Sequence, residues 1–378
     1  MGCAGLIVTS LLGNTLARAQ AAPEEKPLLA EQVFKNVQVL RGLSVNEFME
    51  TMGFFAASLN ANCTTCHGQD SGGSWEGYAS DKVPQKQVAR KMILMVNSIN
   101  QSYFGGQQLL TCYSCHRFGR KPKIIPDLTV QYGDAPDEDP DEVLMQAPGQ
   151  PTPDQVLDKY FKAVGGAEKL ASITSIVARG NWQGYEDTEQ HSLQLYAKAP
   201  DQRTTIVDNH GALTTNTYDG HNGWIAAPIT DVPLTLVTLS GSDLDNARVD
   251  SQLMFLGRIK QSLTDLRVGP PFIINDKDVT ILQGYSAGKS PVKLYFDSET
   301  GLLLRVVRYT TSRVGRQPMR FDYSDYRDVN GIKMPFFWLT TWVDGRSKTQ
   351  LTDVQLNVPI DPAKFAKPAA PSVQPAAK

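Results

Sequence analysis

The sequence predicts a multidomain chain in which a mainly α-helical domain precedes a mainly antiparallel β (α+β) domain. Three observations support this fold class. The 378 residues are enough for two or three domains. Apolar residues repeat at helical spacing between residues 44 and 104, whereas they alternate with polar residues in many short runs between residues 175 and 358. An acidic, proline-rich stretch separates the two patterns.

Composition and charge narrow the class of protein. Hydrophobic residues make up 41% and charged residues 20%, which is typical of a globular chain. Lys and Arg total 37 and Asp and Glu total 39, so the net charge of −2 gives no electrostatic case for nucleic-acid binding. No apolar run reaches the roughly 20 residues of a membrane-spanning helix. Five cysteines are too few for a disulfide scaffold of this size.

The first 21 residues are predicted to be a secretory signal peptide. Small and apolar residues fill positions 2–13, the A-x-A site Ala17-Arg18-Ala19 follows, and polar residues begin at Pro23. Cys3 precedes the apolar run, so we interpret it as part of the removed segment and not as a lipid-bearing cysteine. We therefore expect export to the periplasm, either free or membrane-associated.

The other four cysteines occur in two copies of one pattern, Cys63-Thr64-Thr65-Cys66-His67 and Cys112-Tyr113-Ser114-Cys115-His116. C-x-x-C-H is the attachment motif of c-type haem, in which the two thiols bond the haem and the histidine is the proximal iron ligand. The sequence therefore predicts two covalently attached haem c groups. A zinc site is the alternative, but the 45 residues between Cys66 and Cys112 exceed the gap of about 15–20 that is usual between zinc-binding pairs.

Each motif follows a predicted helix that carries two methionines. The first helix begins at Ser44, where Ser44-x-x-Glu47 is a capping box, and the second begins near Pro84, because proline is favoured in a first turn. No histidine lies in residues 28–62 or 68–111, so a methionine thioether is the candidate sixth ligand of each iron. Core packing is the alternative role of these methionines, and spacing does not choose within the pairs Met49/Met52 and Met92/Met95.

Several runs between residues 33 and 123 resemble the photosynthetic reaction-centre cytochrome c subunit family. The resemblance is carried by Lys35-Asn36-Val37-Gln38-Val39-Leu40, Ser58-Leu59-Asn60-Ala61-Asn62, Ala89-Arg90-Lys91-Met92, Ser98-Ile99-Asn100 and the two C-x-x-C-H motifs. It implies that Met52 and Met92 are the sixth ligands opposite His67 and His116, and that Met49 and Met95 are packing residues. Family members that serve reaction centres carry four haems, whereas this chain has two motifs, so the resemblance favours an exported dihaem relative.

The remaining residues divide into a linker, a β domain and a tail. We predict a dihaem cytochrome c domain at 22–123, a linker at 124–152, an antiparallel β domain at 153–366 and a disordered tail at 367–378. We interpret the linker as solvated chain; the alternative is an acidic segment that docks a partner. The β domain is expected to begin with a helix at 154–164 and to contain a helical patch at 242–256. Turn signals join its strands at Asp219-Gly220, Asn222-Gly223, Asn330-Gly331 and Asp344-Gly345.

The β domain resembles, more weakly, the lipoprotein-carrier half-barrels of the LolA and LolB type. The supporting stretches are residues 218–224, 294–302 and 326–335, which are β-turn phrases. The resemblance implies a curved sheet around an apolar groove that binds an acyl chain or another hydrophobe. A sheet packed solid with its own side chains is the alternative.

Taken together, the motifs predict an exported dihaem cytochrome that passes single electrons between periplasmic or membrane redox proteins, and not an enzyme. The β domain would serve docking or hydrophobic-ligand binding. Two alternatives stay open: a haem enzyme such as a dihaem peroxidase, which needs an open distal site, and a lipid- or quinone-binding redox sensor.

Overall fold

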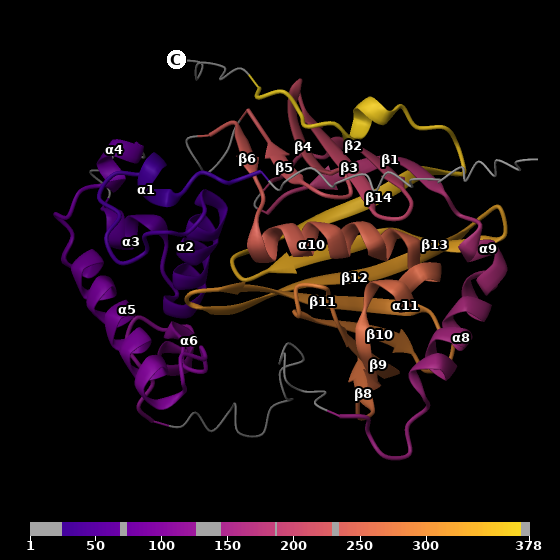
Figure 1. Cartoon of the computed structure of the whole chain (residues 1–378), viewed down its shortest axis with the longest axis horizontal. Helices are drawn as coiled ribbons and strands as arrows, with labels where there is room; N and C mark the ends of the chain where they lie inside the picture. The colour runs from indigo at the N-terminus through magenta and orange to yellow at the C-terminus, as the bar shows by residue number, and fades with distance from the viewer. Residues whose placement is uncertain (1–24, 69–73, 126–144, 186, 229–233, 372–378) are drawn as a thin grey trace, which may run out of the picture.

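A computed structural model describes residues 25–68, 74–125, 145–185, 187–228 and 234–371. The predicted signal peptide, most of the predicted linker and the end of the predicted tail lie outside the described residues. Helices fill the first part of the chain and an antiparallel sheet with a few helices fills the second (Figure 1), so the predicted order of a helical and an antiparallel β region is confirmed. None of the helices in the described ranges is long and apolar enough to cross a membrane.

In the described residues, the helical region contains two long helices and four short ones. Ser44 caps the first long helix by accepting a hydrogen bond from the Glu47 amide at 3.2 Å, and Asn60 ends it in the left-handed conformation (φ 48°). Pro84 occupies the first turn of the second long helix, as predicted. The six helices are α1 (Ala30–Val33), α2 (Val45–Leu59), α3 (Cys63–His67), α4 (Trp75–Tyr78), α5 (Pro84–Tyr103) and α6 (Cys112–His116).

The second region is one large antiparallel sheet, whose strands follow the order β6-β5-β4-β3-β2-β1-β14-β13-β12-β11-β10-β9-β7, with β8 paired to β9. Asn330 and Gly331 both have positive φ (55° and 79°), as the predicted two-residue turn between β12 and β13 requires. The strands are β1 (Ser175–Gln183), β2 (His191–Lys198), β3 (Gln202–Asn209), β4 (Ala212–Tyr218), β5 (Gly223–Ala226), β6 (Leu236–Thr238), β7 (Thr264–Val268), β8 (Phe272–Ile274), β9 (Lys277–Tyr285), β10 (Pro291–Asp297), β11 (Leu303–Ser312), β12 (Gly315–Val329), β13 (Ile332–Trp342) and β14 (Gly345–Leu356).

Three of these strands, β6, β7 and β8, were not predicted from the sequence pattern. Each spans three to five residues, which gives only a weak alternation of apolar and polar side chains; β5 is equally short, but the apolar run Trp224–Ala227 predicts it. They form because a neighbouring strand supplies the hydrogen bonds: β6 pairs with β5, and both β7 and β8 pair with β9. Tertiary pairing therefore extends the sheet beyond what local sequence indicates.

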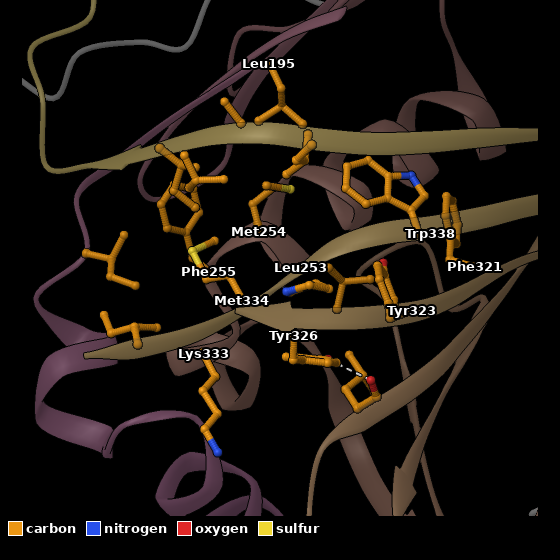
Figure 2. A pocket seen from close by; sticks show the side chains of 18 of the residues that line it. Leu195, Leu253, Met254, Phe255, Phe321, Tyr323, Tyr326, Lys333, Met334 and Trp338 are labelled. Carbon is orange, nitrogen blue, oxygen red and sulfur yellow. Dashed lines mark hydrogen bonds between the residues drawn. The ribbon is translucent and has the colours of Figure 1, made fainter. Parts of the chain in front are cut away.

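One face of the sheet is covered by α8 (Pro153–Val164), α9 (Ala167–Ala171), α10 (Gly241–Gln252), the 3₁₀ segment η2 (Leu253–Arg258) and α11 (Ile259–Ser262). Leu157 and Val164 of α8 and Leu195, Leu294 and Val306 of the sheet are at most 1% exposed in one continuous core. The core is not completely filled. A cavity of about 120 Å³ lies between η2 and the sheet. Phe321, Tyr323 and Trp338 lie close together in its lining (Figure 2).

The helical region packs directly against the β region. Asn46 of α2 donates a hydrogen bond to a carboxylate oxygen of Asp243 on α10 at 2.7 Å. Arg313, in the turn between β11 and β12, donates to the carbonyl of Arg41 at 2.9 Å and accepts at its own carbonyl from Gln108 at 2.5 Å. The β11–β12 hairpin thus reaches into the helical region (Figure 1). Nothing in the local sequence pattern indicated these contacts.

Candidate functional site

The two C-x-x-C-H motifs each form a single helical turn, α3 and α6. The cap of α3 is Asn62, whose side chain accepts a hydrogen bond from the Thr65 amide at 3.2 Å. All four thiols are free, and each pair sits on one turn, so both sulfur atoms of a pair are available on one short segment. Within the described ranges, no group of three or more Cys, His, Asp and Glu side chains gathers as a metal site would require.

Both motif histidines are oriented by a backbone carbonyl. Nδ1 of His67 donates to the carbonyl oxygen of Tyr78 at 2.8 Å, and Nδ1 of His116 donates to that of Gly119 at 2.9 Å. A carbonyl only accepts, so Nδ1 carries the proton and the lone pair of Nε2 stays available. This is how proteins prepare a histidine as a metal ligand. The sequence motif identifies these histidines but says nothing of their carbonyl partners.

The surroundings of His67 favour its neutral form. Burial lowers the pKa of His67, and neutral imidazole is the form that binds a metal. The Tyr78 ring lies 5.0 Å from the imidazole, centroid to centroid, and Trp75 meets Tyr78 edge-on at 5.6 Å. Trp75 in turn contacts Phe34, which stacks on Phe48 of α2 at 5.0 Å. This row of rings connects the first motif to the helix that precedes it.

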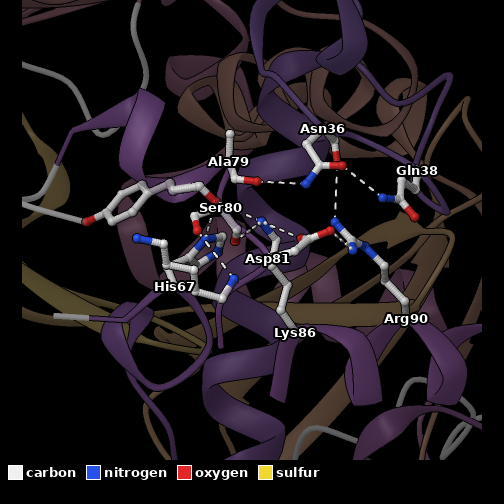
Figure 3. A network of polar contacts seen from close by, with 10 residues as sticks. Asn36, Gln38, His67, Ala79, Ser80, Asp81, Lys86 and Arg90 are labelled. Atoms are coloured by element: carbon white, nitrogen blue, oxygen red, sulfur yellow. Dashed lines mark hydrogen bonds and ion pairs between the residues drawn. The ribbon is translucent and has the colours of Figure 1, made fainter. Parts of the chain in front are cut away.

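A polar network lies behind His67 (Figure 3). The Tyr78 carbonyl that holds His67 also accepts a hydrogen bond from Nζ of Lys86 at 2.8 Å, and Lys86 donates to the Ser80 carbonyl at 3.0 Å. Asp81 lies 3.5 Å from Lys86 and receives a hydrogen bond from Arg90 at 2.9 Å. The Arg90 hydrogen bond holds the pKa of Asp81 well below its usual range. The carboxylate is therefore charged, and its two cations flank it.

The second motif is held by different contacts. Asn100, near the end of α5, exchanges two hydrogen bonds with the backbone of Leu110, at 2.8 and 3.0 Å, two residues before Cys112. After the motif, the Phe118 amide donates to the Ser58 carbonyl of α2 at 3.0 Å, and the Lys123 amide donates to the Cys115 carbonyl at 2.8 Å. These bonds fix the second turn between the two long helices.

The structure places the four candidate methionines in different surroundings. Met52 is half-buried and packs against a cluster that includes Leu40, Leu43 and Ile93. Met49 and Met92 are half-buried as well, whereas Met95 is 44% exposed. The α3 turn packs against α5, and the α6 turn packs against both α2 and α5. Both motifs therefore lie beside α5, which carries Met92 and Met95, and the second also lies beside α2, which carries Met49 and Met52. The choice within each pair stays a prediction.

The residues fit a covalently attached haem. Each site offers two thiols on one turn, a histidine with Nε2 free to ligate, and a helix with half-buried thioethers nearby. Burial raises the pKa of the Cys112 thiol to about 11, so this sulfur is a neutral thiol near neutral pH.

A family model described as the photosynthetic reaction centre cytochrome C subunit matches residues 7–143. The N-terminal region is similar to the reaction-centre cytochromes c. The subunit from Roseobacter denitrificans is 34% identical over 110 residues, which are 27% of this chain and 29% of that protein. The subunit from Thermochromatium tepidum is 34% identical over 118 residues, 30% of this chain and 28% of that protein. These relatives confirm the resemblance, and the family implies covalently bound haem c and electron transfer.

The chain spans less than a third of the length of these relatives, so their activity as whole proteins is not transferred to it. For the β region, a solved structure of a LolA superfamily protein from Nitrosomonas europaea covers 58% of this chain and 99% of that chain, at 13% identity and a TM-score of 0.40.

Proposed function

We propose that the protein is an exported dihaem cytochrome c that carries single electrons between periplasmic or membrane redox partners. Haem would be bonded by Cys63 and Cys66 at one site and by Cys112 and Cys115 at the other. The iron ligands would be His67 with Met52, and His116 with Met92. Bound haem supplies one-electron chemistry at its iron, which accepts and releases an electron without a change in the protein's covalent structure.

The observation that carries the proposal is the pair of pre-oriented histidines. Each sits one residue after a C-x-x-C turn, and each has Nδ1 committed to a carbonyl at 2.8 or 2.9 Å. Nε2 of each histidine is thereby left free to ligate iron, and half-buried thioethers lie on the neighbouring long helices. Haem held by a histidine and a methionine at each site would supply electron transfer and would leave the iron closed to a substrate.

Haem stoichiometry tests the proposal. Protein from a host competent in haem c attachment should contain two haems per chain by pyridine haemochrome assay and mass spectrometry. Replacing Cys63 and Cys66 together by alanine should leave one, and the same change at Cys112 and Cys115 should leave the other. One haem or none in the unchanged protein would refute the proposal. Rapid binding of carbon monoxide by the reduced protein would instead favour the enzyme alternative, because it requires an open site.

A second candidate function, binding of a small apolar ligand, rests on the cavity beneath the sheet. Its walls come from the aromatic group of Phe321, Tyr323 and Trp338 on the sheet and from Leu253 and Met254 of η2 (Figure 2). The volume of about 120 Å³ is somewhat below the roughly 150 Å³ of an apolar cavity that binds benzene. The cavity as it stands therefore suits one ring or a short alkyl segment, and not a whole acyl chain.

Toluene is a suitable probe of this cavity. It should raise the unfolding temperature of the full-length protein, because it binds the folded state only. Met334→Trp, which fills the cavity from β13, should abolish the increase, whereas Lys348→Trp on the exposed side of β14 should not. Equal stabilisation of both variants would show that toluene binds elsewhere.

A further inference from the structure

The carbonyl that orients His67 is shared with a cation. The Tyr78 carbonyl oxygen accepts from Nδ1 of His67 and from Nζ of Lys86, both at 2.8 Å. Two further contacts hold the ammonium there, a hydrogen bond to the Ser80 carbonyl at 3.0 Å and the Asp81 carboxylate at 3.5 Å. Lys86 therefore has a defined position directly behind the ligand histidine (Figure 3).

The charge at this position is poorly screened. The side chains of Lys86 and Arg90 are only 14% and 11% exposed, so solvent and salt weaken their field less than at a surface. Lys86 and Arg90 contribute two positive charges and Asp81 contributes one negative charge. The group formed by these three side chains therefore carries a net charge of +1 behind His67.

Two effects of Lys86 act in the same direction. A carbonyl oxygen that also bonds an ammonium is a weaker acceptor for the N–H of His67, which leaves the imidazole less electron-rich and a poorer donor to oxidised iron. The positive charge itself opposes the more positive oxidation state. Both effects favour the reduced iron and therefore raise its reduction potential.

In the described residues, the carbonyl that holds the histidine of the second site is not shared with a lysine. Nδ1 of His116 donates to the Gly119 carbonyl, and among the hydrogen bonds of the described residues no lysine shares that oxygen. Lys123 packs beside Gly119, but its side chain is exposed to solvent. The two C-x-x-C-H sites thus differ in the burial of the cations near their histidines: Lys86 is largely buried, whereas the cations that follow His116 (Arg117, Arg120, Lys121 and Lys123) are exposed, so solvent and salt screen their charges more strongly.

We propose that Lys86, acting through the Tyr78 carbonyl and His67, raises the reduction potential of the first haem and makes the two haems inequivalent. This inference rests on the proposed function, since it needs haem at both motifs. Lys86 is a positioning and tuning residue, because it touches His67 only through the shared carbonyl. Lys86 would thereby favour the presence of an electron on the first haem.

Spectroelectrochemical titration of the loaded full-length protein tests the proposal. Lys86→Gln removes the charge but keeps an amide donor. It should lower the reduction potential of one of the two haems and leave the potential of the other unchanged. Lys86→Arg keeps the charge and should restore most of the lost potential. Asp81→Asn removes the negative charge and should shift the same haem upward. A structural disturbance would not move one potential in opposite directions according to charge.

Lys82→Gln is the matched control. Lys82 is exposed and four residues away, so this change removes the same formal charge without touching the Tyr78 carbonyl. If Lys86→Gln shifts neither haem, shifts both equally, or shifts no more than Lys82→Gln, while two haems are bound, the role of Lys86 is wrong and the proposed function stands. If the unchanged protein binds fewer than two haems, both proposals fail. Haem content measured on the same samples separates these outcomes.

Discussion

Replacement of Asn100 tests how the second C-x-x-C-H turn is held. Asn100 is 4% exposed, and its side-chain amide donates to the Leu110 carbonyl at 2.8 Å and accepts from the Leu110 amide at 3.0 Å. These two bonds tie the end of α5 to the segment that leads into Cys112. We expect Asn100→Ala to destabilise the helical region and to loosen the second motif specifically.

The size of the effect follows from the contacts. A typical hydrogen bond contributes about 1 kcal/mol net, and a buried backbone group left without a partner costs about 1–3 kcal/mol. Leu110 is half-buried, so in the variant water can hydrogen-bond in part to the Leu110 amide and carbonyl. The loss of two such bonds should therefore cost about 2–3 kcal/mol, which lowers the folding equilibrium constant by a factor on the order of 30–150.

Urea unfolding of the loaded protein, followed at the haem absorption band, measures this cost. Asn97→Ala is the control, because Asn97 lies one turn earlier on α5 and is exposed. Asn100→Asp adds a second check: its carboxylate can still accept from the Leu110 amide but repels the Leu110 carbonyl, so the loss should shrink at acid pH, where the carboxyl can donate. If Asn100→Ala costs no more than about 0.5 kcal/mol beyond Asn97→Ala, the bidentate contact does not hold the motif.

Three further predictions concern the ligands and the contact between the two regions. Met52→Ala should remove part of the thioether-to-ferric-iron absorption band and open that haem to carbon monoxide, whereas Met49→Leu should leave the band intact. The reverse result would mean that Met49, one helical turn earlier, is the ligand. Cleavage within residues 126–144 should leave the helical and β regions associated in size-exclusion chromatography, because hydrogen bonds of Asn46, Gln108 and Arg313 join the two regions. Elution as two separate fragments would contradict this. Burial raises the pKa of Asp243 and raises that of its neighbour Glu50 on α2 to about 9, so this carboxyl pair shares a proton in the folded state and the association should weaken as the pH rises from the ordinary carboxyl range towards 9. Glu50→Gln should flatten this pH dependence, and an unchanged profile would exclude the carboxyl pair as its source.

The chemistry of this protein is determined by its sequence to an unusual degree. C-x-x-C-H places two thiols and a histidine on five consecutive residues, so the ligand set is local and does not depend on distant folding. The helix boundaries at Ser44, Asn60 and Pro84 are likewise local, because caps and proline act within one turn. The longer strands of the β region were predicted for a similar reason, since alternating or continuously apolar runs rich in β-branched and aromatic residues are a local signal.

Other features were decided only by the tertiary structure. The carbonyls of Tyr78 and Gly119 became histidine partners through backbone geometry, which no side-chain pattern encodes. In the sequence, Lys86 is indistinguishable from any other lysine on a helix, and only the fold places it against the Tyr78 carbonyl. The contact of α2 with α10 joins residues almost 200 positions apart, and such pairings depend on the complete shape of both surfaces. Sequence thus determined which groups can bind haem, and the fold determined the charge and hydrogen bonds that make the two sites different.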